Sequence, residues 1–213
     1  MANMKIDFVS DVSCPWCAVG LKSLEAALAR VGSAVDAEVH FQPFELNPQM
    51  APEGEDVAEH LARKYGPSLD MARSQEALAA RGDAVGFHFD FRKRSRIYNT
   101  FDAHRLLHWA DGEGKQLALK NALFNAYFTQ GQDPSNHELL VSVAKSVGLE
   151  EKRAREILAS DEFAREVRDR ENFYTNAGIH SVPAVIINDR HLIQGGQPPE
   201  VFEQALRQLA AEG

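Results

Sequence analysis

The chain has 213 residues, of which 44% are hydrophobic and 25% charged, and its formal net charge is −8. This length allows one large domain or a core domain with a sizeable insertion. The acidic balance argues against nucleic acid as a partner, because phosphate binding needs concentrated Lys and Arg. The one basic run, residues 92–96, has no interleaved aromatic side chains, so we interpret it as a solvated loop or a local anion contact.

The first residues contain no recognisable targeting segment. Asp7 comes before any apolar run, which does not fit a secretory signal, and no stretch approaches the ~20 apolar residues of a membrane helix. We therefore expect a cytoplasmic protein without a membrane partner. Structural disulfides are rare in that reducing compartment, so the single pair of cysteines needs another explanation.

The N-terminal stretch predicts a β-α-β unit. Residues 5–9 have the composition of a strand, and residues 35–44 predict a second one. Between them, apolar residues at a helical period follow Cys14, and Gly32 is a suitable helix end. A crossover helix of this length places the two strands parallel.

Helical periodicity dominates residues 51–177, where we expect five to seven helices and no internal repeat. Residues 87–91 alternate phenylalanine with polar residues, which fits either a short strand or a loop that packs its aromatic rings.

Residues 178–213 return to β structure. An apolar strand at 182–187, a turn at Asn188-Asp189 and a strand at 191–193 predict an antiparallel hairpin, and Pro199 begins a terminal helix. The whole order predicts an α/β fold in which residues 1–50 and 178–213 form the two halves of one mixed sheet. Residues 51–177 are then a large helical insertion between the halves.

The motif Cys14-Pro15-Trp16-Cys17 stands between the first predicted strand and the first predicted helix. There the two sulfurs are within reach of each other, and the N–H groups at the helix start favour the thiolate of Cys14. Pro15 suits the first helical position, where its missing N–H costs no bond. Cys17 lies one turn further in and is expected to be more buried. We therefore predict that Cys14 attacks a disulfide and that Cys17 resolves the mixed disulfide.

Other interpretations of the cysteine pair are less favoured. A structural zinc site needs four ligands, whereas the chain has two cysteines and no histidine pair near them. Two inert buried cysteines would not need to stand directly before a helix. No glycine-rich phosphate loop is present, so the sequence indicates neither a metal nor an organic cofactor.

A second candidate element is Val182-Pro183, just before the third predicted strand. A proline at a strand start can be purely structural. The functional interpretation is a cis peptide bond that faces the cysteines, with the backbone of Val182 free to pair with an extended substrate.

With these motifs in this order, the sequence resembles the DsbA-like branch of the thioredoxin superfamily, and within it the FrnE-like group of dithiol–disulfide isomerases. The stretches 43–48, 99–105 and 195–198 carry the resemblance further along the chain. It implies a thioredoxin fold (βαβ…ββα, mixed sheet) interrupted by a large all-helical insertion. It also implies that Cys14 is the nucleophile and Cys17 the resolving thiol, with cis-Pro183 beside them.

Two residues depart from the family pattern. Ser181 stands where glycine is common, and we expect it to narrow the approach to the site. Trp16 stands where DsbA carries a histidine, so the resemblance does not imply strong oxidising power.

Several polar residues are candidates for supporting roles. We expect Asp11 to cap the active-site helix, with an effect on the thiol pKa as the alternative. Asp7 is either a buried acid that takes protons from Cys17 through water or a residue with an exposed or helix-pairing role. His180 lies either along the cleft or at the surface, and helix packing explains His104 and Arg105 at least as well as a role in the site.

Three functions fit these residues. The favoured one is a thiol–disulfide oxidoreductase or isomerase acting on a disulfide-containing protein or a small thiol such as glutathione. The alternatives are a glutathione-dependent transferase or isomerase of the kappa-like branch, whose members carry serine at the position of Cys14, and a non-catalytic holdase-type binding protein. The sequence does not decide whether exposed apolar residues of the insertion form a substrate groove or a homodimer contact.

Overall fold

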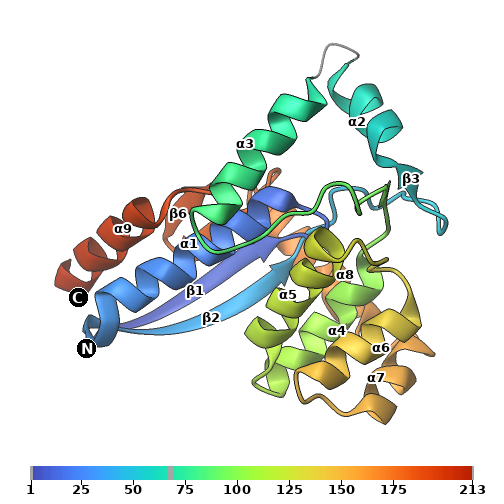
Figure 1. The fold of residues 1–213 in the computed structure, drawn as a ribbon. Helices are drawn as coiled ribbons and strands as arrows, with labels where there is room; N and C mark the ends of the chain where they lie inside the picture. The colour runs from blue at the N-terminus through green and yellow to red at the C-terminus, as the bar shows by residue number, and fades with distance from the viewer. Residues whose placement is uncertain (1, 67–69, 213) are drawn as a thin grey trace.

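A four-stranded mixed sheet lies at the centre of the protein (Figure 1). The computed structural model describes residues 2–66 and 70–212. From one edge to the other, the strands are β2 (Val35–Pro43), β1 (Ala2–Ser10), β5 (Ala184–Ile187) and β6 (His191–Gln194). β1 runs parallel to β2 and antiparallel to β5. The two ends of the chain therefore share one sheet, and the predicted parallel β-α-β unit is confirmed.

Helix α1 (Pro15–Val31) connects the two parallel strands. Pro15 occupies its first turn, where the missing N–H costs no hydrogen bond. Gly32 ends the helix with a φ of 53°, a conformation that glycine adopts without steric cost, and its N–H donates to the Leu28 carbonyl. The short 3₁₀ turn η1 (Gly32–Ala34) then leads into β2.

Strand β1 is longer than its apolar pattern predicts. It begins at Ala2 rather than at Lys5, because residues 2–4 pair with residues 35–37 of β2. Backbone hydrogen bonds satisfy these residues whatever their side chains, so the polar Asn3 does not interrupt the strand.

The two faces of the sheet have different covers. Side chains alternate along β1, so Ile6 and Phe8 join the core formed with α1 and α9 (Pro199–Glu212), which pack against each other. Val9 faces the opposite side, where it packs with Tyr174 of α8. Every second residue of β1 is therefore separated from α1 by the sheet itself.

Between β2 and β5 the described residues form seven α-helices, at the upper end of the predicted range. These are α2 (Val57–Tyr65), α3 (Met71–Asp83), α4 (Phe101–Gly112), α5 (Gln116–Phe124), α6 (His137–Ser146), α7 (Glu151–Leu158) and α8 (Ala164–Asn176). A π-helical turn, η2 (Asn125–Thr129), extends α5. A two-stranded pair, β3 (Glu55–Asp56) with β4 (Arg96–Ile97), also lies in this segment.

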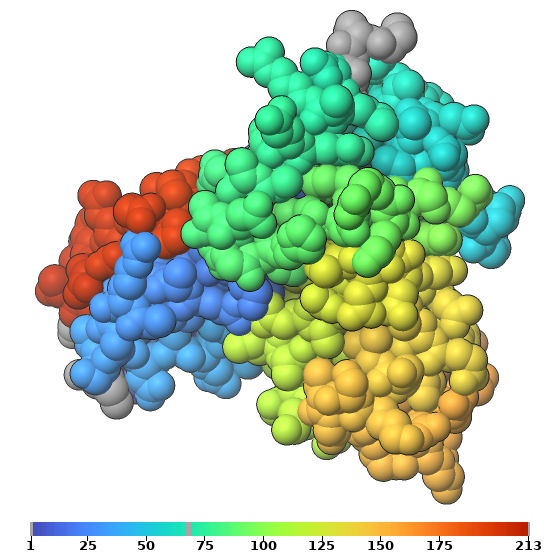
Figure 2. All heavy atoms as spheres, in the orientation of Figure 1, coloured from blue at the N-terminus to red at the C-terminus, as the bar shows by residue number. Residues whose placement is uncertain are grey.

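The helices gather in two places around the sheet (Figures 1 and 2). Helices α4, α5 and α8 contact β2, and α4 to α7 share a core of their own with Val12 from the loop after β1. Helices α2 and α3 project from the top of the molecule in this view, and α3 contacts α1. The start of α1 therefore lies where the two helical groups meet.

Residues 87–91 form a loop rather than a strand. The ring of Phe89 lies 4.8 Å from that of Phe87 and 5.1 Å from that of Phe91, measured between centroids. Phe87 and Phe89 belong to the same core as the two cysteines. The alternation of the sequence thus reflects aromatic packing in the core that contains the two cysteines, one of the two predicted outcomes.

The C-terminal hairpin is confirmed. β5 pairs antiparallel with β6, and the turn residues Asn188 and Asp189 have φ values of 52° and 57°. Two consecutive left-handed residues match the twist of the flanking strands, and Asn and Asp tolerate this conformation better than most residues.

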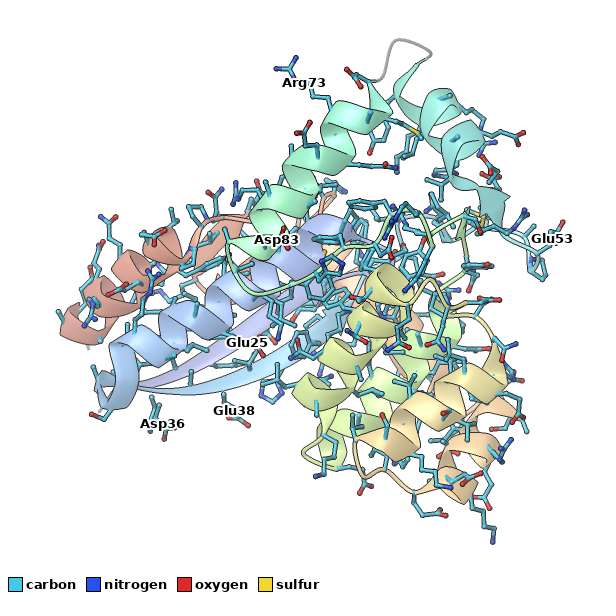
Figure 3. The ribbon with its side chains drawn as sticks, viewed as in Figure 1. Glu25, Asp36, Glu38, Glu53, Arg73 and Asp83 are labelled. Carbon is cyan, nitrogen blue, oxygen red and sulfur yellow. The ribbon has the colours of Figure 1, made fainter. Side chains whose placement is uncertain are left out.

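Charged side chains lie mainly on the outside, as Figure 3 shows for Asp36 and Glu38 along β2 and for Glu53 before β3. Among residues 2–66 and 70–212, no helix has both the length and the apolar character needed to cross a membrane.

Candidate active site

Cys14 occupies the N-cap position of α1, directly before Pro15. Its backbone is extended, with φ −90° and ψ 112°, and the Cys17 N–H donates to its sulfur at 3.3 Å. Free N–H groups at a helix start attract negative charge, and the Cys14 sulfur lies at this end of α1. The local sequence creates the arrangement, because proline begins the helix and leaves the preceding residue as the cap.

The two thiols differ in burial. Cys14 is 4% exposed and Cys17 is 0% exposed, and neither is in a disulfide. Burial raises the pKa of Cys17 well above its ordinary value, and the hydrogen bond and negative charge of Cys14 raise it further. Cys17 therefore stays protonated at neutral pH unless another group takes its proton.

The Val182–Pro183 segment lies against Cys14. Their peptide bond is cis, and the Cys14 thiol lies 3.7 Å from the Val182 carbonyl oxygen. Pro183 is buried, whereas Ser181 is exposed at the edge of the site. Gly20 of α1 lets Pro183 pack closely against the helix, because a Cβ at this position would lie only 3.1 Å from the Pro183 ring.

Trp16 is the most exposed member of the cysteine motif, with 39% of its surface accessible. The Arg81 guanidinium of α3 lies 5.7 Å from the centre of the Trp16 ring. It also donates a hydrogen bond to the Gly196 carbonyl at 2.8 Å. A Cβ at Gly196 would come within 2.9 Å of the Trp16 carbonyl oxygen. The stretch 195–198 thus supports the motif from the side by close backbone approach.

Asp11 is buried and heavily hydrogen-bonded. Its carboxylate accepts from the Thr100 hydroxyl at 2.7 Å, the Leu46 N–H at 2.8 Å and the Ser13 hydroxyl at 3.0 Å, and the His104 ring lies 3.4 Å away. Burial alone would raise the pKa of Asp11, but the bonds and the charge of His104 outweigh it and lower the pKa to about 2.

The predicted capping role of Asp11 is wrong. Cys14 is the N-cap of α1, and the Asp11 carboxylate instead accepts from the N–H and hydroxyl of Ser13 within the loop. Asp11 is too early in the chain to reach the first helical turn, so it fixes the loop that carries Cys14 and ties it to α4 and to the segment after β2.

A groove of about 540 Å³ opens in front of Cys14. The active-site loop and Ser181-Val182 form one wall, and α2 and α3 form the other. Tyr65 and Leu78 supply apolar surface, while Lys64 and Arg94 supply positive charge. The groove is large enough for a short peptide segment or a small thiol compound.

A family model described as a DSBA-like thioredoxin domain matches residues 5–207. The chain belongs to this family. The predicted fold class, an α/β thioredoxin fold with a mixed sheet and a helical segment between its halves, is thereby confirmed.

Individual proteins are similar to this DSBA-like chain over nearly its whole length. A Streptomyces coelicolor structure described as a "probable DsbA oxidoreductase" has 35% identity and a TM-score of 0.88, covering 99% of this chain and 91% of the other. The uncharacterized protein YwbO of Bacillus subtilis is 27% identical over 205 residues, 96% of each chain. The cytosolic disulfide reductase DsbM of Pseudomonas aeruginosa with GSH has 16% identity and a TM-score of 0.66, covering 97% and 99%, and shares the fold.

Asp7 does not lie near the thiols of this DSBA-like domain. It is buried on the far face of β1, where it pairs with Lys5 at 2.9 Å and accepts from the Gln42 side chain at 2.7 Å. The predicted proton path from Cys17 to Asp7 is therefore blocked by the strand itself. Asp7 lies one position from both Ile6 and Phe8, which face α1, so it points to the opposite face, because the side-chain period of a strand is two.

The histidine and arginine candidates divide between the site and the helix packing. His104 is buried beside Asp11 and contacts the Phe44 carbonyl at 3.2 Å. Arg105 does not contact Asp11. It donates to the carbonyls of Glu162 and Ile157, which fixes α4 to the segment around α7. His180 is exposed on the rim of the groove.

Sequence reasoning missed Lys120 of α5. This lysine is 0% exposed and belongs to the surroundings of Cys17, where its charge lowers the pKa that burial raises. A signal was present in the periodicity, since Lys120 falls on the stripe that α5 buries, with Gln116, Leu119, Leu123 and Phe124.

Proposed function

We propose that this protein exchanges disulfides through Cys14 and Cys17 as a thiol–disulfide oxidoreductase. The observation that carries the proposal is the position of Cys14. Its sulfur accepts the Cys17 N–H at 3.3 Å and lies 3.7 Å from the Val182 carbonyl, beside the cis Val182–Pro183 bond. Membership of a family whose structural neighbours are named oxidoreductases and a disulfide reductase supports it.

In the first step, the Cys14 thiolate attacks one sulfur of a substrate disulfide. A Cys14–substrate disulfide forms, the substrate S–S bond breaks, and the second substrate sulfur leaves as a thiolate. The substrate backbone lies extended against Val182, whose neighbour Ser181 is exposed at the mouth of the groove. Pro15 and Trp16 line the same groove and border the bound segment.

In the second step, Cys17 loses its proton and attacks the Cys14 sulfur. The Cys14–substrate bond breaks, the substrate leaves with the electron pair as a thiolate, and a Cys14–Cys17 disulfide remains. Two electrons have then passed from the protein to the substrate. Isomerisation uses the same first step, with the substrate thiolate attacking another disulfide before Cys17 acts.

We propose reduction or isomerisation as the net direction, in the cytoplasm, where a thiol pool restores the dithiol. The fold neighbour named a cytosolic disulfide reductase supports this direction, and its complex with GSH supports glutathione as a substrate or reductant. The cations Lys64 and Arg94 along the groove complement the carboxylates of glutathione or of an acidic peptide.

We further propose a division of labour along the chain. Residues 1–50 and 178–213 carry the cysteines and cis-Pro183, and residues 51–177 form a helical insertion that supplies the outer wall of the groove. The reaction needs no metal or organic cofactor in this proposal, because the two thiols supply the electrons.

The reduction potential of the Cys14–Cys17 couple tests the proposal. Trp16 fluorescence in glutathione redox buffers reports it, and a Trp109→Phe background removes the other tryptophan, which is buried in the helical core. We expect a reversible two-electron couple between roughly −270 and −120 mV. A pair that does not oxidise, or that oxidises without turning over any disulfide, contradicts an exchange enzyme.

Two variants separate the alternative functions. Tight glutathione binding with unchanged activity in Cys17→Ser indicates a glutathione-dependent transferase or isomerase, because only the resolving thiol is missing. Full protection of an unfolding client by the Cys14→Ser, Cys17→Ser double variant indicates a holdase-type binding protein. Our proposal expects loss of disulfide reduction in both variants, because reduction needs Cys14 to attack and Cys17 to resolve the mixed disulfide.

A further inference from the structure

Lys120 is a buried cation in the core around the two thiols. It is 0% exposed, and its amine has no hydrogen-bond partner among residues 2–66 and 70–212. The amine lies 5.0 Å from the ring centre of Phe124 and 5.9 Å from that of Phe41. Lysine is rarely buried without a partner, because its charge loses hydration that aromatic rings replace only in part. Because burying this amine costs stability, a role for Lys120 in the reaction is a reason for it to be there.

The charged and titratable groups around Lys120 come from α1 and the loop before it, from α4 (His104, His108 and Asp111) and from α8 (Arg170). Cys17 of α1, the N-cap residue Cys14 and Asp11 of the preceding loop act on the charge of Lys120. His104 of α4 lies on the same side but is engaged with Asp11 and the Phe44 carbonyl. The Asp11 carboxylate is also occupied by its own donors. The thiols are therefore the groups near Lys120 whose charge changes during disulfide exchange.

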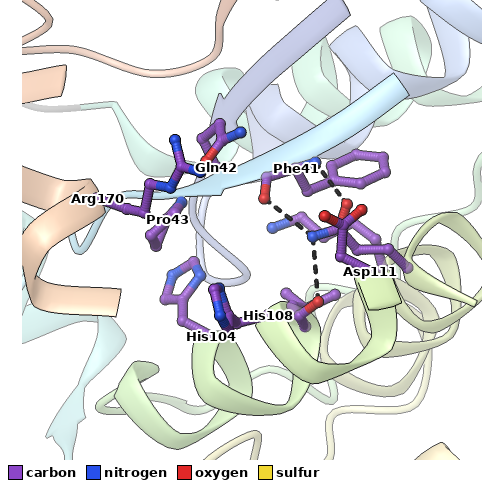
Figure 4. A pocket seen from close by; sticks show the side chains of 10 residues that line it. Phe41, Gln42, Pro43, His104, His108, Asp111 and Arg170 are labelled. Carbon is purple, nitrogen blue, oxygen red and sulfur yellow. Dashed lines mark hydrogen bonds between the residues drawn. The ribbon is translucent and has the colours of Figure 1, made fainter. Parts of the chain in front are cut away.

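A small polar cavity lies between β2 and α4, with Lys120 in its lining (Figure 4). It has a volume of about 40 Å³, room for about two water molecules, and is lined by Lys120, Gln116 and His104. Asp111 and Arg170, both exposed, stand at its rim. In Figure 4 the α4 residues His104, His108 and Asp111 face the end of β2 across this space. This cavity and the groove in front of Cys14 share no lining residue.

We propose that Lys120 accepts the proton of Cys17 when Cys17 resolves the mixed disulfide, an inference that rests on the proposed exchange reaction. The neutral amine takes the thiol proton and becomes an ammonium group. The Cys17 thiolate attacks the Cys14 sulfur, the Cys14–substrate bond breaks, and the substrate leaves as a thiolate with the bonding electron pair. The ammonium group then passes its proton to water in the cavity, which restores the amine.

The acid–base properties of the two groups fit this order. Burial lowers the pKa of Lys120 from its ordinary 10.5 to about 8, so the amine form is available near neutral pH. Burial raises the pKa of Cys17, so the resolving thiol needs a base. A base that titrates near the working pH is the most effective proton acceptor.

A single-turnover reaction with an aromatic disulfide, 5,5′-dithiobis(2-nitrobenzoate), separates the two steps. The first coloured thiolate is released when Cys14 attacks, and the second when Cys17 resolves the mixed disulfide. In Lys120→Met we expect the second phase to slow by about 100-fold, while the first changes by less than about threefold. The wild-type second phase should rise through pH 8 as Lys120 loses its proton, and the variant should lose this rise. Lys115→Met, an exposed lysine just before α5, is the matched control.

Each other outcome has a defined meaning. A second phase in Lys120→Met with the rate and pH profile of the wild type overturns the proposal and leaves the exchange reaction intact. Lys120→Arg keeps a positive charge but does not release a proton, so full activity in this variant also overturns it, in favour of a fixed charge. If Lys120→Met does not fold, Lys120→Gln is measured by the same criteria. Absence of both phases in the wild type contradicts the exchange reaction itself, and the role of Lys120 with it.

Discussion

Asp11 and Lys120 are two buried charged residues near α1 that differ in their hydrogen bonding. The Asp11 carboxylate accepts hydrogen bonds from Thr100 and from two other residues, whereas the Lys120 amine has no such partner among the residues that the structure describes. The consequence appears in their pKa values, which lie at about 2 for Asp11 and about 8 for Lys120. A saturated charge holds structure in place, while an unsaturated one stays free to change its protonation state.

The largest expected effect is the loss of Asp11. We expect Asp11→Ala to lower the free energy of unfolding by about 3–5 kcal/mol, because the buried donors of Thr100 and Leu46 lose their acceptor. Urea denaturation at pH 7 measures this loss. Asp36→Ala, an exposed carboxylate on β2, is the control and should change little. A loss below about 1 kcal/mol for Asp11→Ala would mean that the network does not stabilise the loop.

Removing the charge of Lys120 should change the free energy of unfolding in the opposite direction. We expect Lys120→Met to raise the free energy of unfolding at pH 7 by on the order of 3 kcal/mol. Folding lowers the pKa of Lys120 from 10.5 to about 8, so its charged form destabilises the folded protein. Urea denaturation beside Lys115→Met checks the sign. If Lys120→Met is more stable and resolves the mixed disulfide more slowly, Lys120 has a reactive role. Replacing a residue with a purely structural role would lower both the stability and the rate.

The pH dependence of this difference gives an independent check. A cation with a lowered folded-state pKa makes the folded protein least stable below that pKa, and the deficit disappears as the pH rises from about 8 to 10.5. The gap between Lys120→Met and the wild type should therefore close over this window. Both proteins are compared in a Cys17→Ser background, which removes the opposing contribution of Cys17, whose pKa is raised. A gap that stays constant up to pH 10.5 would show that the pKa of Lys120 is the same in the folded and the unfolded protein.

Asp11 predicts a pH effect at the acid end. Its pKa is lowered from 3.8 to about 2, so its stabilisation is complete above pH 4 and is lost as the pH falls towards 2, by about 2 kcal/mol. Unfolding curves between pH 5 and 2 should show this loss in the wild type and not in Asp11→Asn. Equal slopes in the two proteins would assign the acid sensitivity to other carboxylates.

Glu45 is an intermediate case and should give the smallest effect. Its side chain is 3% exposed, and it shares Arg168 with Glu171. Burial and then the charge of Glu171 raise the pKa of Glu45 to about 7. A raised carboxyl pKa means stability that is present below about pH 4.5 and lost as the pH rises to 7.

Glu45→Gln should remove about 1 kcal/mol of this dependence, a figure reduced for the compensating charge of Arg168. Denaturation at pH 4.5 and 7.5 compares it with the wild type, and Glu53→Gln, on an exposed turn, is the control. The same pH slope in Glu45→Gln and the wild type would place the raised pKa on Glu171 instead.

Several structural features could be predicted from local patterns. The parallel β-α-β unit, the antiparallel C-terminal hairpin and the helical stretch between them follow from side-chain period and from turn residues such as Asn188 and Gly32. The start of β1 was missed because backbone pairing, which no side-chain pattern records, extends it to Ala2.

The supporting residues of the site were predicted less well. Asp11 was expected at the helix cap, but the cap is Cys14, and Asp11 instead binds Thr100 and Leu46 from segments far along the chain. Asp7 was considered as a proton acceptor although it lies on the far face of β1. Lys120 was overlooked because a lysine in a helix is normally solvated, and only the packing of α5 against β2 buries it.

The sequence by itself determined the order of strands and helices, the helix start at Pro15 and the positions of Cys14 and Cys17, because periodicity and capping act over a few neighbouring residues. The tertiary structure alone decided which charges surround those thiols. Burial and hydrogen bonding depend on contacts between Asp11 or Lys120 and residues tens of positions away, and these contacts exist only once the helical segment has packed against the sheet.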